Sequence, residues 1–127
     1  MQEAELAALA ARRTEELPGS ELTHPFGEDW EVWKVRGRVF MLQTEITGES
    51  IVILKAAPED GKALREAHPD VTPGYHMNKK HWITVHPGDT IEPGLVEDLV
   101  TESYLLVIEG LPRRQRPVDP ATFGRDR

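Results

Sequence analysis

Two apolar runs separated by one Arg-Gly pair constrain the fold of this chain more than any other feature. The segments WEVWKV (30–35) and RVFMLQTE (38–45) are rich in β-branched and aromatic residues. Arg36-Gly37 between them has the length of a two-residue hairpin turn. The pattern therefore predicts an antiparallel hairpin, which needs further strands or helices to bury its apolar side chains.

The two-residue turn also predicts a register for this hairpin. Trp33 is expected opposite Phe40, and Lys34 opposite Val39. The segment SIVILKA (50–56) follows a turn and predicts a third strand.

Proline positions and apolar periodicity predict the remaining elements. Pro58 suits the first turn of a helix that Pro69 closes, and Asp89 or Thr90 suits the N-cap of the last helix. The predicted elements are, in order, a helix at 3–16, an extended piece at 21–27, strands at 30–35, 38–45 and 50–56, a helix after 58, a strand at 81–87 and a helix at 93–110.

This order of elements predicts an α+β fold. The economical packing has two layers, a twisted antiparallel sheet with the helices packed on one face. Residues 1–111 are expected to form a single domain. Residues 112–127, with three prolines and five arginines, are expected to form a basic tail that is either a mobile arm or an extension docked on a partner.

Composition excludes several classes of protein. At 127 residues the chain can bury a core without disulfides, and it contains no cysteine, which excludes thiol catalysis and thiolate zinc sites. No apolar run reaches the ~20 residues of a membrane span, and the acidic amino terminus does not resemble an export signal. We therefore expect a cytoplasmic protein with no membrane association.

Charge is distributed unevenly along the chain. The net charge is -7, and the tail carries five arginines against two aspartates, which leaves -10 for residues 1–111. Such an acidic body argues against indiscriminate nucleic-acid binding. Two windows, 32–44 and 71–88, nevertheless contain no carboxylate, as expected of a protein with one selected basic surface.

The segment PGYHMNKKHW (73–82) concentrates the residues that can carry chemistry. His76, His81 and His86 are spaced by five, a spacing that places them on one face of neither a strand nor a helix, so we expect no metal site. No Gly-x-Ser-x-Gly elbow, Gly-rich phosphate loop or other catalytic motif is present, so we expect neither an enzyme nor a cofactor.

Anion binding is the chemistry that this segment favours. Lys79 and Lys80 supply charges for phosphate, and Tyr75 and Trp82 either stack on a base or serve as scaffold. The alternative is a solvated turn with Trp82 as a core anchor. Strand alternation would turn the two lysines to opposite faces.

Four segments, in order, resemble the MmcQ/YjbR family: LPGSELTHPFGEDWEVWKVRGRVF, ILKAAPE, VTPGYHMNKKHWITV and SYLLVIEGLP. The resemblance runs from about residue 17 to residue 112, and PGYHMNKKHW is its specific part. It implies a small bacterial protein with a twisted antiparallel sheet and helices on one side, likened to frataxin-like (CyaY-like) and secretion-chaperone-like domains. Members are usually labelled DNA-binding, and the resemblance implies no catalytic residue and no cofactor.

These observations together predict a non-enzymatic protein that binds nucleic acid, weakly or with a partner's help, as a monomer or a homodimer. The alternatives are a chaperone-like adaptor for a protein partner and a binder of a phosphorylated metabolite, which requires a concave pocket beside His76 and Lys79. The candidate contact residues are Lys34, Arg38, Lys55, Tyr75, His76, Asn78, Lys79, Lys80, His81 and Trp82.

Overall fold

The structure, a computed structural model, describes residues 1–124 of the chain. Six strands form one antiparallel sheet in the order β1-β2-β3-β4-β6-β5. The strands are β1 (Ser20–Thr23), β2 (Trp30–Val35), β3 (Arg38–Thr44), β4 (Ile51–Lys55), β5 (Val71–Pro73) and β6 (Trp82–Val85).

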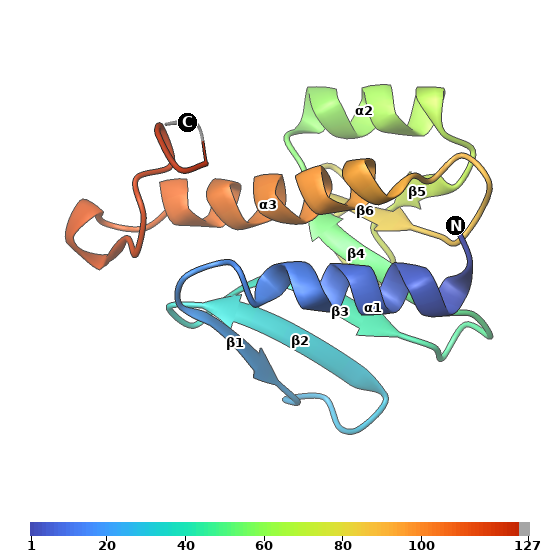
Figure 1. Cartoon of the computed structure of the whole chain (residues 1–127), viewed down its shortest axis with the longest axis horizontal. Helices are drawn as coiled ribbons and strands as arrows, with labels where there is room; N and C mark the ends of the chain where they lie inside the picture. Colours follow the sequence, from blue (N-terminus) through green and yellow to red (C-terminus); the bar gives the residue numbers. More distant parts are fainter. Residues whose placement is uncertain (125–127) are drawn as a thin grey trace.

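Three helices pack on one face of the sheet (Figure 1), which confirms the predicted α+β fold. They are α1 (Glu3–Thr14), α2 (Pro58–Ala67) and α3 (Pro93–Glu109), followed by the short 3-10 helix η1 (Arg113–Gln115). Helices α1 and α3 lie side by side across the sheet. Within residues 1–124, no helix has the length and apolarity needed to cross a membrane.

The beginning of α3 differs from the prediction. Its N-cap is Glu92, which makes no side-chain capping bond, and neither Asp89 nor Thr90 caps the helix. The Thr90 hydroxyl instead donates a hydrogen bond to Asp70 Oδ2 at 2.7 Å. Pro93 in the first turn supplies the preset backbone angle that starts the helix.

The β2–β3 hairpin forms around the predicted turn but contains a bulge. Arg36 (φ 51°) and Gly37 (φ 79°) both have positive φ, as a two-residue type I′ turn requires. Lys34 lies opposite Val39 as predicted, whereas the prediction for Trp33 is wrong, because it lies opposite Met41. Residue 40 is therefore the extra residue of a β-bulge.

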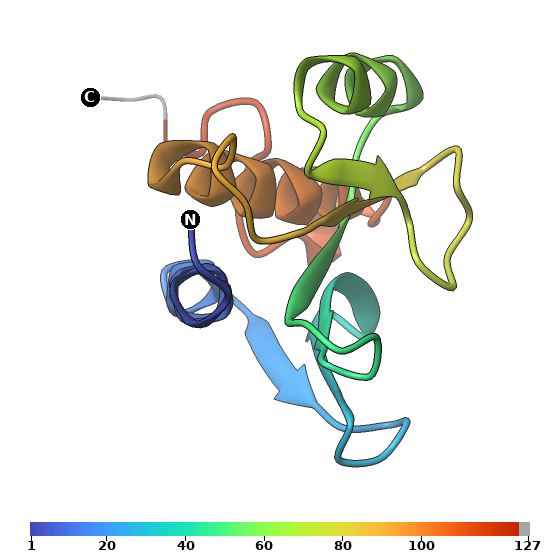
Figure 2. The same cartoon turned by 90° about the vertical axis from the view of Figure 1, so that its right-hand side faces the viewer.

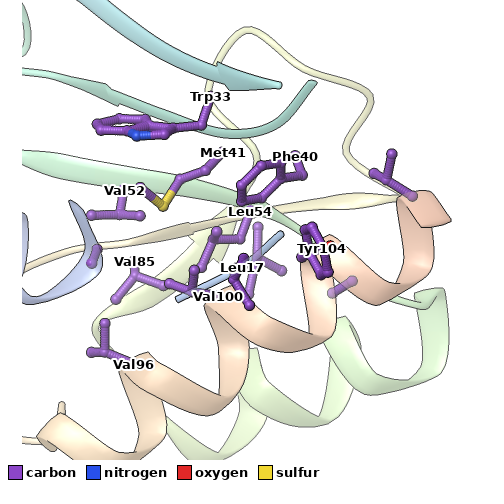
Figure 3. Close-up of a cluster of buried hydrophobic side chains, with 14 of the residues drawn as sticks. Leu17, Trp33, Phe40, Met41, Val52, Leu54, Val85, Val96, Val100 and Tyr104 are labelled. Carbon is purple, nitrogen blue, oxygen red and sulfur yellow. The ribbon is translucent and has the colours of Figure 1, made fainter. Parts of the chain in front are cut away.

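The main core lies between the sheet and the helices (Figure 3). The bulge turns both Phe40 and Met41 toward the helices, and both side chains are fully buried. The Phe40 ring meets Tyr104 of α3 edge-on, with centroids 5.5 Å apart.

A second buried cluster occupies the face of the sheet away from the helices, here called the open face. It consists of Val32, Leu42, Ile51, Ile53 and Trp82. Residues 74–81, here called the cover loop, cross this face and pack on the cluster through Tyr75 and Met77. Figure 2 shows the cover loop in yellow, on the side of the sheet away from α1 and α3.

The described part of the C-terminal tail, residues 112–124, folds back on the domain. Arg36 donates a hydrogen bond to the Gln115 carbonyl at 2.9 Å, and Arg116 donates to the carbonyls of Glu109 and Leu111, both at 2.9 Å. Val118 and Phe123 pack against the main core. Arginine donors thus satisfy carbonyls at the end of α3. Residues 125–127 of the predicted tail lie outside the described residues.

Candidate functional site

The cover loop begins with a glycine that no other residue can replace without displacing the backbone. Gly74 N donates to the Trp82 carbonyl at 2.8 Å. A Cβ atom on Gly74 would lie 2.6 Å from Trp82 Cβ and 3.0 Å from the Trp82 carbonyl carbon and oxygen. The close approach of these two backbones closes the loop at its base.

Two side chains hold the loop in place. The buried Thr84 hydroxyl accepts a hydrogen bond from Tyr75 N at 2.8 Å and donates one to the Pro73 carbonyl at 3.0 Å. The Lys79 ammonium donates to the Gly74 carbonyl at 2.8 Å. Lys79 is therefore also part of the loop's framework, and two of its three N–H donors remain.

Aromatic rings gather where the cover loop crosses the sheet. The Tyr75 ring is nearly parallel to Trp30, with an interplanar angle of 14° and centroids 6.2 Å apart. His76 meets the Tyr75 ring at 4.2 Å and has a left-handed backbone (φ 56°). Histidine is among the few residues enriched in this conformation, which non-glycine residues otherwise adopt mostly at functional sites and turns.

Tyr75 lines two cavities on the open face. The first has a volume of about 270 Å³ and is lined by Phe26, Trp30, Leu42, Tyr75, His76 and Met77. The second has a volume of about 260 Å³ and is lined by Thr47, Ile51, Thr72, Pro73, Tyr75, Lys79, Thr84 and His86.

Neither of these two cavities is lined by a carboxylate among the described residues. Three larger cavities, of about 440, 370 and 620 Å³, are each lined by at least two acidic side chains. In a chain with 22 aspartates and glutamates, the cavities beside the cover loop therefore differ in charge from these three cavities.

A chain of hydrogen bonds stands beside the second cavity. Glu49 Oε2 lies 2.7 Å from His86 Nδ1, and His86 Nε2 lies 2.8 Å from Thr72 Oγ1. Carboxylate, imidazole and hydroxyl have this connectivity in hydrolase triads. Here both ring nitrogens join neighbouring segments, so the chain of bonds ties the turn before β4 to the β5–β6 hairpin.

The structure brings only part of the predicted site together. Tyr75 and His76 line the first cavity, and Lys79 lines the second. Lys80 and His81 are exposed on the loop, and the Asn78 side chain accepts a hydrogen bond from Lys80 N at 2.9 Å. Lys79 and Lys80 belong to a loop, so strand alternation does not decide which way they face.

Trp82 serves as scaffold, which was one of the two alternatives predicted for it. Its side chain is 9% exposed and belongs to the second buried cluster, so it offers no free face for stacking. The Lys55 ammonium lies 5.4 Å from the centre of its ring, in cation–π range.

The basic hairpin contributes to two different surfaces. Lys34 pairs in register with Val39 and with Glu21, which places it on the open face beside an acidic neighbour. Arg38 donates a hydrogen bond to the Gly110 carbonyl at 3.1 Å, at the end of α3. Arg38 is therefore turned away from the cover loop, and the predicted single patch is incomplete.

Sequence reasoning missed four of the six residues that line the first cavity, namely Phe26, Trp30, Leu42 and Met77. Phe26 is 64% exposed, and Trp30 and Met77 line the same wall. The available signal in the sequence was a phenylalanine within the turn segment HPFG (24–27), where a large apolar side chain is rarely needed for the core. Within residues 1–124, no three histidine or acidic side chains are placed to hold a metal ion.

The chain is similar in sequence to bacterial proteins of about its own length. It is 42% identical over 121 residues to "Uncharacterized protein YbdF" of Escherichia coli O157:H7, covering 94% of this chain and 99% of that protein. It is 34% identical over 101 residues to "Uncharacterized protein YjbR" of Escherichia coli strain K12, covering 78% and 84%. These names state no activity, ligand or partner.

Solved structures and a family model agree with this similarity. Deinococcus radiodurans protein DR2400 is 36% identical with a TM-score of 0.77, over 91% of this chain and 85% of that one. A Pseudomonas syringae protein is 25% identical with a TM-score of 0.65, over 84% and 98%. The family model described as YjbR matches residues 15–106. As the resemblance in sequence indicated, the chain belongs to the YjbR family.

Proposed function

We propose that this chain is a cytoplasmic, non-enzymatic protein that binds single-stranded nucleic acid on its open face, at the cover loop. The observation that carries this proposal is the pair of cavities that Tyr75 lines and that no carboxylate of the described residues lines. At these cavities, electrostatic repulsion between an anionic ligand and the carboxylates of the protein should be weakest.

A single strand fits this surface better than a duplex does. The aromatic side chains line a recess beneath a loop, and an unpaired base can enter such a recess, whereas a stacked and paired base cannot. The cations available to backbone phosphates on this face are Lys34, Lys55, Lys79 and Lys80. With so few cations on an acidic body, binding should be weak.

Fluorescence anisotropy of labelled single-stranded and duplex oligonucleotides at several salt concentrations tests this proposal. We expect the single strand to bind more tightly. The logarithm of its affinity should fall with the logarithm of salt concentration, with a slope of about -0.7 per phosphate contacted.

Two matched variants locate the contact. Lys80→Met removes an exposed cation of the cover loop and should lower both the affinity and the salt slope. Lys62→Met makes the same change on exposed α2, on the helical face, and should alter neither. Equal effects of the two variants, or binding that does not respond to salt, would contradict the proposal.

A phosphorylated small metabolite is a second candidate ligand. It requires a concave pocket beside His76 and Lys79, of which His76 lines the first cavity and Lys79 the second. If oligonucleotides do not bind at low salt, the search moves to such metabolites and to a protein partner.

A further inference from the structure

Strand β1 leaves one edge of the sheet without a partner (Figure 1). It is the outermost strand, and among residues 1–124 it pairs only with β2. The opposite edge, β5, has three residues, ends in Pro73, which has no N–H to donate, and packs against α2. An unpaired edge strand can bind a further strand, and β1 is the edge of this sheet that is open to one.

The backbone of Leu22 points its hydrogen-bonding groups out of the sheet. The two-residue turn pairs Val35 with Arg38, so the N–H and C=O of Val35 face β3. By alternation Lys34 faces β1, where it lies opposite Glu21, and the next residue of β1, Leu22, faces away from β2. No hydrogen bond from another part of residues 1–124 reaches these two groups of Leu22, so they are free to pair with an added strand.

The Leu22 side chain is exposed as well. The residue lies opposite Trp33 on the helical face, yet 47% of it is exposed. The Ser20 N–H, which alternation also turns away from β2, donates to the Leu17 carbonyl in the turn before β1 and so agrees with this direction. Strand β1 thus presents an apolar side chain and unpaired backbone groups at one residue, as a strand that binds a partner strand does.

One register suits the pairing of two copies of β1 about a two-fold axis. Opposite residues of an antiparallel pair lie on the same face, so a symmetric pair places one residue opposite its own copy. Pairing centred on Leu22 joins its outward N–H and C=O to those of the second copy and brings the two leucine side chains together. It also places Glu21 opposite Thr23 of the second copy, whereas pairing centred on Glu21 would set two carboxylates against each other.

We propose that two copies of this chain pair through β1, with Leu22 opposite Leu22 of the second copy, and form one continuous antiparallel sheet. The two-fold axis is perpendicular to the sheet, so both open faces lie on the same side. Because neighbouring strands lie about 4.8 Å apart, the Lys34 backbones of the two copies are about 15 Å apart on that side. The second copy thereby doubles the cations that one nucleic-acid strand can meet, although the pairing itself does not depend on the proposed function.

Sedimentation equilibrium of the full chain, without nucleic acid, tests this pairing. One short pair of strands makes a smaller interface than that of a permanent dimer, so we expect a reversible dimer with a dissociation constant on the order of 100 μM. Each copy carries a net charge of -7, so the dimer should tighten as salt screens the repulsion between the copies. A chain that stays monomeric at about 1 mM, at both low and high salt, would overturn the proposal.

Two variants at position 22 test the register. Leu22→Asp and Leu22→Lys each set like charges opposite each other, so each alone should weaken the dimer about tenfold or more. An equal mixture of the two should associate again, because aspartate then lies opposite lysine. Ile46→Asp is the matched control, since Ile46 is 48% exposed on the turn between β3 and β4, and it should leave the dimer unchanged.

Circular dichroism of each variant shows whether the fold is kept, as expected for substitutions at exposed positions. A dimer that persists in both single variants, or that Ile46→Asp weakens equally, would mean that the copies associate through another surface. Two folded variants that do not associate when mixed would show that position 22 does not lie opposite its own copy. Each of these results leaves the proposed function standing, because oligonucleotide binding is measured separately.

Discussion

At the scale of single residues, Gly74 shows how closely the cover loop approaches strand β6. Replacement by alanine would force a methyl group into the Trp82 backbone. We expect Gly74→Ala to lower the free energy of unfolding by about 2–3 kcal/mol, as overpacking of a filled site does. Urea denaturation followed by circular dichroism measures this loss.

The control for this substitution is Gly94→Ala in the first turn of α3. An added Cβ there meets no atom within 4 Å. Because alanine favours the helix over glycine, this variant should be neutral or more stable by up to about 1 kcal/mol. Equal losses at both positions would contradict the tight approach at Gly74.

Tyr104 makes stability depend on pH in the alkaline range. Burial raises the pKa of Tyr104 from 10.0 to about 12, and the charge of Arg36 opposes this shift in part. Because the folded state holds the proton more tightly than the unfolded chain, this stabilisation is complete below pH 10 and is lost between pH 10 and 12. The slope should be about 1.4 kcal/mol per pH unit.

Tyr104→Phe isolates this effect. The variant also loses the hydrogen bond that the hydroxyl donates to the Pro18 carbonyl at 2.6 Å, so it should be less stable by about 1 kcal/mol at neutral pH. In denaturation curves from pH 8 to 12, the advantage of the unmodified protein should shrink above pH 10 and reverse before pH 12, because the loss of about 1.4 kcal/mol per pH unit exceeds the initial difference of about 1 kcal/mol. A constant difference would show that the Tyr104 pKa is not raised.

At the scale of secondary-structure elements, Ser103 links helix α3 to the bulged hairpin. Its buried hydroxyl donates to the Phe40 carbonyl at 2.6 Å and accepts a hydrogen bond from Lys55 N at 2.8 Å. The bulge removes Phe40 from the regular pairing, so this serine supplies a partner that the strand ladder does not.

Ser103→Ala should therefore cost about 2–4 kcal/mol, because it leaves two buried backbone groups without a partner. Glu102→Ala, on the exposed side of the same helix, should change stability by less than about 0.5 kcal/mol. Thermal unfolding of the two variants tests this difference. Similar melting temperatures would mean that water or a backbone shift replaces the serine.

The elements that could be predicted from the sequence are those set by local chemistry. Arg36-Gly37 predicted the hairpin turn that it forms, and Pro58 predicted the first turn of the helix that it begins. The bulge could not be predicted, because the hydrogen-bond partner of its Phe40 carbonyl, Ser103, lies 63 residues away in the sequence. The N-cap prediction for Thr90 was wrong for the same reason, since Asp70 binds that hydroxyl.

At the scale of the whole molecule, the candidate site could be predicted only in part. The PGYHMNKKHW segment indicated Tyr75, His76 and Lys79, which the fold gathers around the two cavities. Phe26 and Trp30 come from a different part of the chain, and only the folded structure brings them beside Tyr75 and His76. Strand alternation could not show that Arg36 and Arg38 face away from the cover loop. Their hydrogen-bond acceptors are carbonyls of the tail and of the end of α3, which are distant in the sequence.

Substitutions at two phenylalanines should separate effects on stability from effects on ligand binding. Phe123 is half-buried on the main core, with its ring centre 6.1 Å from that of Tyr104. Phe123→Ala should therefore lower the free energy of unfolding by about 1 kcal/mol. Phe26→Ala should leave stability unchanged, since this side chain is 64% exposed, but should weaken oligonucleotide binding severalfold. Chemical denaturation and calorimetry on both variants measure the two effects. Loss of binding in Phe123→Ala alone would place the site elsewhere.

The cover loop also seals the second buried cluster, and this restricts how the site can operate. Lifting the loop would expose Leu42, Trp82 and their neighbours to water, at a cost that grows with each square ångström of apolar surface uncovered. If the proposed site binds a ligand, we therefore expect the ligand to enter past Phe26 without displacing the loop. Such a site would act as a rigid receptor rather than a gate, selecting its ligand by shape and passing no movement to the helical face.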